Sequence, residues 1–360
     1  MVRRKRKKKI LWPNVAVMGA SLLLLLALGF FGAMLSGGGA YGTVLLMACL
    51  LLSAWVQIIA HEGGHLIAGL LTGYGFVSFR IGSVILTRSA TGLRLGILSL
   101  AGTGGQCLLS PPALREDGTY PSLWYHLGGC LMNLLCALLA LAGLLLTHSA
   151  WRVWHLCTLV IAVVFALMNG IPLHAGMVDN DGMNALRMRK DRDVAMGMYR
   201  QLQINAAIAE GLRLRDMPSE WFECTPAQER DNGIFRLLRQ VDMHDLDAAI
   251  DTARKLSHNK KINGIYRGMA ENEKQCLQLL RGEKLDASSA ELKQYRKAMK
   301  DSAPVLRAQY MLALLDEQDE VKAAKYARKF DRMARHYPYP NDIAMDRELM
   351  NMAREKAGNT

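Results

Sequence analysis

Five consecutive residues carry the clearest chemical signal in this chain of 360 residues. Residues 61–65 read His-Glu-Gly-Gly-His, which places two imidazoles at His61 and His65 and a carboxylate at Glu62. Side chains four positions apart on a helix project from one face, so both histidines can bind one Zn²⁺. Glu62 can then accept the proton of a water that the metal activates. The motif therefore predicts metal-assisted hydrolysis.

A third protein ligand is required, because catalytic zinc sites commonly have three and leave the fourth position to water. The first 181 residues contain only five acids, so the candidates are few. Glu116 and Asp117 lie in a polar loop, which leaves Asp179 and Asp181. Asp181 is followed by glycine and is the better candidate, and Asp179 is the alternative metal ligand.

These residues must be positioned by apolar segments, since no Lys, Arg, His, Asp or Glu lies between Lys9 and His61. We predict four transmembrane helices, each long enough to cross a hydrocarbon layer of about 30 Å. Their approximate bounds are 14–35, 43–70, 122–147 and 151–172. The first is longer than the apolar core of a signal peptide, about 7 to 15 residues, so it is interpreted as a retained anchor.

The basic residues set the expected orientation. The cluster from Arg3 to Lys9 precedes the first span, and the positive-inside rule places it in the cytoplasm. The link 71–121 then also lies inside, and it carries four arginines. The same counting puts the C-terminal half in the cytoplasm. We expect a multi-pass protein of the cytoplasmic membrane with both termini inside and with the basic cluster on anionic lipid.

The link 71–121 has the pattern of β-structure. Two apolar, glycine-interrupted runs, Tyr74 to Leu86 and Leu93 to Leu100, predict two or more strands. An exposed edge of such an element could pair with an extended peptide.

From about residue 183 the sequence is charge-mixed and helical. Pro304–Asp316 and Asp319–Arg335 have apolar residues at helical spacing and predict an antiparallel helix pair, with a similar pair within Gly233–Leu256. The spacing is similar to that of tetratricopeptide-type repeats, which often bind peptides. A helical domain without such a groove is the alternative.

The predicted fold is therefore an all-α membrane protein with about four transmembrane helices, a small membrane-associated β element and a soluble, possibly tetratricopeptide-like domain. The expected ranges are a basic terminus at 1–13, a membrane domain at 14–182 and a cytoplasmic domain at 183–360 that binds a protein partner. The net charge of +12 is not accompanied by a basic patch with interleaved aromatic residues, so no nucleic-acid partner is expected.

Two further elements follow the HEGGH motif. Residues 129–133 read Gly-Cys-Leu-Met-Asn and end at Asn133. Residues 169–172 read Asn-Gly-Ile-Pro and lead, after eight more residues, to Asp181-Gly182. In this order, over residues 43–182, the three elements resemble the site-2 protease family of intramembrane zinc metalloproteases. That family couples HExxH on one transmembrane helix to an Asn-x-x-Pro segment and an Asp-Gly pair on another.

The resemblance implies that Asp181 is the third zinc ligand and that Glu62 is the general base. It implies a zinc metalloendopeptidase that cuts membrane-anchored proteins or remnant signal peptides within the membrane. Pro172 predicts the end of the last span, which lets Asp181 turn back toward the metal. Asn133 and Asn169 are candidates for binding the substrate backbone, and interhelical packing is the alternative for both.

Two other functions remain open from the sequence. The first is a non-proteolytic membrane scaffold whose helical domain binds a cytoplasmic partner. The second is a membrane-anchored protease that cuts soluble peptides. The four residues His61, Glu62, His65 and Asp181 argue against the scaffold, since a retired protease has no chemical need to keep all of them.

Overall fold

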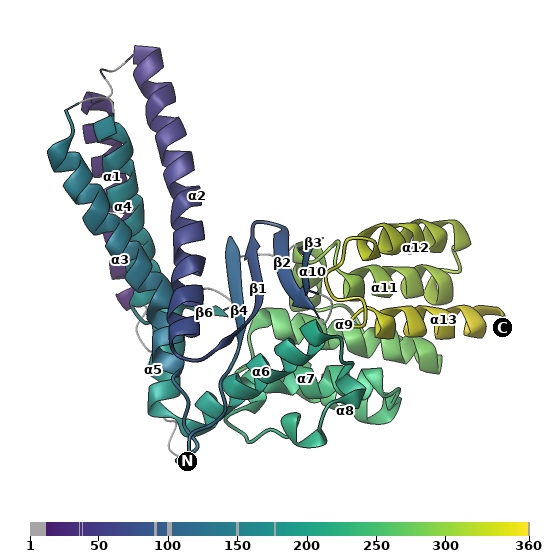
Figure 1. The fold of residues 1–360 in the computed structure, drawn as a ribbon. Coiled ribbons are helices and arrows are strands. Elements are labelled where there is room, and N and C mark those ends of the chain that lie inside the picture. The colour runs from purple at the N-terminus through teal and green to yellow at the C-terminus, as the bar shows by residue number, and fades with distance from the viewer. Residues whose placement is uncertain are drawn as a thin grey trace, which may run out of the picture. The chain divides into compact units, whose positions relative to one another are not determined.

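A computed structural model describes residues 12–35, 37, 39–89, 92–98, 103–148, 151–175 and 178–358. The chain forms two compact units, shown in Figure 1. Unit 1 comprises the described chain up to Thr72 together with Pro121–Lys190, and unit 2 comprises Gly73–Tyr120 together with the chain from Asp191 onward. Residues 73–120, which lie in the link predicted to be strand-containing, thus group with the C-terminal helices. The basic cluster from Arg3 to Lys9 lies outside the described residues.

Unit 1 contains four helices that are long and apolar enough to cross a membrane. They are α1 (Trp12–Leu35), α2 (Gly39–Leu71), α3 (Ser122–Leu146) and α4 (Trp151–Gly170). Their positions agree with the four predicted spans. The main difference is the start of α2, which begins at Gly39 rather than near residue 43. Gly37 and Gly39 have positive φ angles of 78° and 67°, which glycine adopts readily.

Small and polar residues hold these helices together. Gly64 of α2 and Gly128 of α3 face each other so closely that a Cβ on either one would meet the other's backbone oxygen. Ser53 Oγ and Thr158 Oγ1 form a buried hydrogen bond of 3.1 Å between α2 and α4. Such contacts are what apolar helices use where lipid removes the hydrophobic driving force.

The end of α4 leads through a short hairpin to a polar helix. The hairpin consists of β5 (His174–Ala175) and β6 (Val178–Asp179), and α5 (Asp181–Lys190) follows. The predicted domain boundary at 182/183 falls inside α5, and unit 1 continues to the end of that helix.

Unit 2 begins with an antiparallel sheet of order β3-β2-β1-β4. Its strands are β1 (Gly75–Ile81), β2 (Val84–Ser89), β3 (Gly92–Ile97) and β4 (Gly105–Ser110). The two or more strands predicted for the link 71–121 are thus present, and the run from Tyr74 to Leu86 forms a hairpin in which Gly82 turns the chain at a φ of 59°. In Figure 1 the sheet and the helices that follow it form this unit.

The rest of unit 2 is helical. The helices are α6 (Arg192–Glu210), α7 (Glu229–Asp242), α8 (Leu246–His258), α9 (Gly264–Arg281), α10 (Ala290–Ala298), α11 (Ala303–Met311), α12 (Glu320–Ala334) and α13 (Ala344–Gly358). Short 3₁₀ turns lie at Leu214–Asp216 and Ser219–Trp221, and the π-helical turn Leu312–Asp316 extends α11. Helices α7 and α8, and α11 and α12, match the two expected pairs. A tetratricopeptide-type repeat remains a prediction.

Local sequence signals define several of these helix ends. Asp245, Asn263 and Asp319 cap α8, α9 and α12 by accepting a hydrogen bond from a backbone N–H of the first turn. Gly211 and Gly282 end α6 and α9 in the left-handed conformation, with φ angles of 98° and 74°. Buried aliphatic residues then join α7, α8, α9 and α13 into one core, which includes Leu237, Ala253, Leu277 and Leu349.

Candidate metal centre

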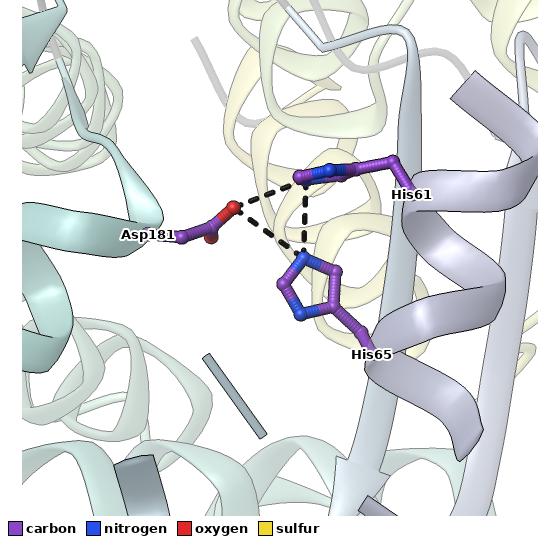
Figure 2. A group of neighbouring side chains, drawn as sticks. All are labelled: His61, His65 and Asp181. Carbon is purple, nitrogen blue, oxygen red and sulfur yellow. Dashed lines mark hydrogen bonds and ion pairs between the residues drawn. The ribbon is translucent and has the colours of Figure 1, made fainter. Parts of the chain in front are cut away.

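Two helices of unit 1 bring three ligand atoms to one point, as Figure 2 shows. Helix α2 presents His61 and His65 from one face, and the first residue of α5 is Asp181. Asp181 Oδ2 lies 3.0 Å from His61 Nε2 and 3.4 Å from His65 Nε2. The two Nε2 atoms are 3.2 Å apart. The aspartate that the sequence favoured is therefore the one beside the histidines.

A buried amide fixes the ring of His61. Asn133 Nδ2 lies 3.2 Å from the carbonyl oxygen of Gln57 and 2.7 Å from Gln57 Oε1. A carbonyl oxygen only accepts, so the Asn133 atom that faces it must be the amide nitrogen. Asn133 Oδ1 consequently faces His61 Nδ1, at 2.7 Å, and accepts a hydrogen bond from the Nδ1–H group. The lone pair of His61 is left on Nε2, on the side of Asp181.

The ring of His65 is fixed in the same way by a backbone group. His65 Nδ1 lies 2.7 Å from the carbonyl oxygen of Tyr125, at the start of α3, and donates to it. Both imidazoles thus carry their proton on Nδ1 when neutral. Hydrogen bonding of the remote nitrogen is how proteins orient histidines that bind metals.

The donor set fits a divalent cation. Two Nε2 lone pairs and one carboxylate oxygen face each other, and between neutral rings no proton is available for them to share. With ligand bonds of about 2.0–2.1 Å at tetrahedral angles, zinc holds its ligand atoms about 3.3 Å apart. The observed separations of 3.0 to 3.4 Å are close to this value. The residues present are those that zinc prefers, and their spacing accommodates the ion.

Gly129 makes room for the two rings. A Cβ at this position of α3 would lie 2.6 Å from His61 Cε1 and 2.6 Å from His65 Nε2. Both histidines are 8% exposed, so α3 covers them without displacing them. Gly129 opens the segment that ends at Asn133: Gly129 leaves space beside both rings, and the Asn133 amide accepts a hydrogen bond from His61.

Asn180 connects the end of α4 to the start of α5, where Asp181 lies. Pro172 has no N–H, so it cannot donate to the carbonyl of Met168 as a helical residue would. Asn180 Nδ2 donates to that carbonyl instead, at 2.6 Å. Asn180 Oδ1 accepts from the backbone N–H of Met183 at 2.9 Å and caps α5. One side chain therefore joins the end of α4 to the start of α5.

Gly182 allows the same approach of backbones. A Cβ there would collide with the carbonyl group of Gly170, the last residue of α4. The Asp-Gly pair thus combines a carboxylate with a residue small enough to let that carboxylate reach His61 and His65.

The structure places the remaining candidates elsewhere. Asp179 forms an ion pair of 2.8 Å with Arg187, and its side chain is 6% exposed. Asn169 Nδ2 donates to the carbonyl of Phe165, one turn back on its own helix, at 3.0 Å. Glu62 is partly buried and lies on α2 between the two histidines.

Two residues at the centre were not expected from the sequence. Gln57 precedes His61 by one helical turn, and it is a fully buried polar residue in an apolar span. A glutamine in an apolar span could have been noticed in the sequence, because polar side chains in spans are costly unless they are paired. Asn180 gave no comparable signal, since an asparagine in a polar loop is common.

No match is found when the chain is compared with models of protein families, with curated proteins or with solved structures. Any assignment of function therefore depends on the geometry of this centre and on the helices that carry it.

Proposed function

We propose that this protein is a zinc-dependent intramembrane endopeptidase of the site-2 protease type. One observation carries the proposal: Asp181 Oδ2 of α5 lies within 3.4 Å of His61 Nε2 and His65 Nε2, and both histidines belong to α2, which is apolar and long enough to cross a membrane. An ionisable cluster in such a helix is costly, so it is retained where it has a function.

The chain would hold zinc through these three side chains, with Asn133 and the Tyr125 carbonyl keeping the imidazoles in the tautomer that binds metal. When bound, zinc supplies Lewis acidity, which lowers the pKa of water and stabilises the negative charge that develops on the substrate carbonyl oxygen. Gly129 lets both rings approach that ion together.

Glu62 is the proposed general base. It follows His61 directly on α2, and its side chain is partly buried. The carboxylate accepts a proton from the attacking water as the oxygen–carbon bond forms. It returns that proton to the amine as the peptide C–N bond breaks, so the products are a free carboxylate and a free amine.

An extended substrate fits the proposal better than a helical one. A transmembrane helix hides its carbonyls in internal hydrogen bonds and must unwind before cleavage. Strand β3 lies at the edge of the sheet and exposes Leu93 and Leu95. The Ile97 N–H points away from β2 and donates to the carbonyl of His336. Because backbone groups alternate in direction along a strand, every second residue of β3 before Ile97 also faces away from β2. An unwound apolar segment can add to this edge.

The remaining features belong to the same proposal. The protein would lie in the cell membrane with both termini in the cytoplasm, and its basic N-terminal cluster would contact anionic lipid. Its substrates would be membrane-anchored proteins or remnant signal peptides. Unit 2 would present the sheet edge and a surface for a cytoplasmic protein partner.

Glu62→Gln tests the general base. We expect the variant to lose cleavage and to retain zinc, because an amide cannot accept the proton while the three ligands are unchanged. Membrane proteomes of cells with the wild-type protein and with the variant should differ by accumulated uncut substrates. Glu116→Gln, at an exposed loop carboxylate of unit 2, is the matched control and should leave the proteome unchanged. Identical proteomes with wild type and Glu62→Gln would remove the assigned role.

A further inference from the structure

Helix α12 of unit 2 has an exposed basic side. Lys325, Arg328, Arg332 and Arg335 follow one another at intervals of three or four residues, which places them along one side of the helix and its last turn. All four side chains are exposed, and none of them forms an ion pair in the described part of the chain. Four cations are therefore directed to the surroundings of unit 2.

The remaining residues of α12 do not neutralise this side. The acids of the helix are Glu320, in the first turn, and Asp331, which forms an ion pair of 3.3 Å with Arg347. Phe330 is buried and packs into the core of unit 2. The helix is thus held to unit 2 by its apolar side and keeps an excess of positive charge on the exposed one.

The exposed face of the sheet in the same unit is apolar. An antiparallel sheet that covers a core with one face normally carries polar residues on the other. Ile85 and Thr87 of β2 are buried. The strand register places Leu93, Leu95 and Ile97 of β3 on the face opposite to these two, where they are 64%, 78% and 53% exposed. Exposed apolar patches of this kind mark surfaces that bind a protein or a membrane.

The basic helix and the apolar strand meet at the end of α12. The Ile97 N–H donates to the carbonyl of His336 at 2.9 Å, and His336 directly follows Arg335. A further cation lies on the sheet itself, because Arg88 of β2 is exposed and is the register partner of Leu93. Cations therefore adjoin the apolar residues of β3. The α12–β3 surface is defined as Arg88, Leu93, Leu95, Ile97, Lys325, Arg328, Arg332 and Arg335.

We propose that the α12–β3 surface binds the anionic surface of a lipid bilayer. The apolar side chains of β3 enter the layer of headgroups, and the cations contact anionic headgroups. The composition of the surface selects this partner, because a bilayer presents negative charge above hydrocarbon, whereas a nucleic acid presents charge without an apolar layer. Four to eight basic residues on an amphipathic helix are typical of binding to anionic lipid.

The course of the chain supports the same partner. Helix α2, which is apolar and long enough to cross a membrane, ends at Leu71, and β1 of the sheet begins at Gly75. A bilayer that α2 crosses is therefore available to the sheet in every molecule, without a second protein. This inference goes beyond the proposed protease chemistry and would stand if the metal centre had another role.

Site-specific photo-cross-linking identifies what covers the surface. Leu95, the most exposed of the three apolar residues, is replaced by p-benzoylphenylalanine in the full-length protein, which is reconstituted in nanodiscs of phosphatidylcholine with or without phosphatidylserine. We expect a lipid adduct, identified by mass spectrometry, that is at least about fivefold stronger with phosphatidylserine and falls at high salt. The same replacement at Met243, an exposed apolar residue at the end of α7, is the matched control and should give little lipid adduct.

A charge variant tests the basic side of α12. Lys325→Gln, Arg328→Gln and Arg332→Gln together should lower the adduct at position 95 at least about tenfold, since each cation near an anionic surface contributes roughly fivefold to binding. These side chains are exposed and form no ion pair in the described part of the chain, so the variant should fold as the wild type does.

Two controls separate this effect from net charge and from catalysis. Lys255→Gln, Lys260→Gln and Lys261→Gln together remove the same charge from exposed positions at the end of α8 and should leave the adduct unchanged. Glu62→Gln should also leave it unchanged, because the surface acts independently of the proposed general base.

Equal lipid adducts with and without phosphatidylserine would overturn the proposal, and so would equal adducts at Leu95 and Met243 or equal losses in the two charge variants. Cross-linking in cell membranes distinguishes the other occupants. A cross-linked dimer of this chain, or an adduct with another protein in place of lipid, would show that the surface binds protein and would likewise overturn the proposal.

Discussion

Two buried groups of charged side chains, one in each unit, show how this chain compensates charge in apolar surroundings. In unit 2, Glu273 and Asp346 are compensated by Arg307, a cation that the chain itself provides. In unit 1, His61, His65 and Asp181 offer three acceptors to one point and have no arginine or lysine among them. The first arrangement contains its own cation, whereas the second does not, which is why we propose a metal ion there. This difference distinguishes a structural cluster from a candidate site.

The largest effect is expected from removing the cation of unit 2. Arg307→Met leaves Glu273 and Asp346 buried without a counter-charge, which should reduce the free energy of unfolding by about 3–5 kcal/mol. Arg347→Met removes the exposed ion pair with Asp331 and should cost at most about 1 kcal/mol. Denaturant unfolding of the two variants measures both. Equal destabilisation would show that burial does not distinguish these ion pairs.

The second test concerns the two asparagines that were both expected to bind substrate. Asn133→Ala should weaken zinc affinity about 10- to 100-fold, because the amide orients His61. Asn169→Ala removes a hydrogen bond to Phe165, its one partner in the described part of the chain, and should leave zinc affinity near that of the wild type. Competition with a chelator of known affinity compares them. If the two variants lost zinc equally, the contact to His61 would have no special role.

Two glycines of the metal centre give the smallest expected effect. Gly129→Ala places a methyl group against both imidazoles and should cost about 1 kcal/mol of stability and part of the zinc affinity. Gly63→Ala, inside the HEGGH motif, has no atom within 4 Å of the added Cβ and should be neutral or slightly stabilising. Thermal unfolding with and without zinc compares the pair. A larger loss at Gly63 would contradict the packing described for α2 and α3.

The features that the sequence predicted well are local ones. The four spans depend on continuous apolar length, and α1 to α4 occupy them. The break after the last span follows from Pro172, and α4 ends at Gly170. The candidate ligands followed from the scarcity of acids before residue 182, and Asp181 lies at the histidines.

The features that the sequence did not predict depend on tertiary contacts. Two or more strands were expected in the link 71–121, but the order β3-β2-β1-β4, which pairs β1 with the distant β4, does not follow from the hydrophobic pattern. Asn133 faces His61 only because α3 packs closely on α2, and Asn180 reaches Met168 only because the chain returns to the end of α4. The grouping of the sheet with the C-terminal helices likewise depends on contacts between distant segments.

The zinc content of the purified protein tests the central claim most directly. Wild-type protein and the Asp181→Asn and Asp179→Asn variants are measured by elemental analysis after dialysis against a weak chelator. We predict about one zinc per chain in the wild type, loss of zinc in Asp181→Asn, and full retention in Asp179→Asn, whose carboxylate is paired with Arg187. Wild-type protein without zinc, or Asp181→Asn with as much zinc as the wild type, would contradict the metal centre described for unit 1.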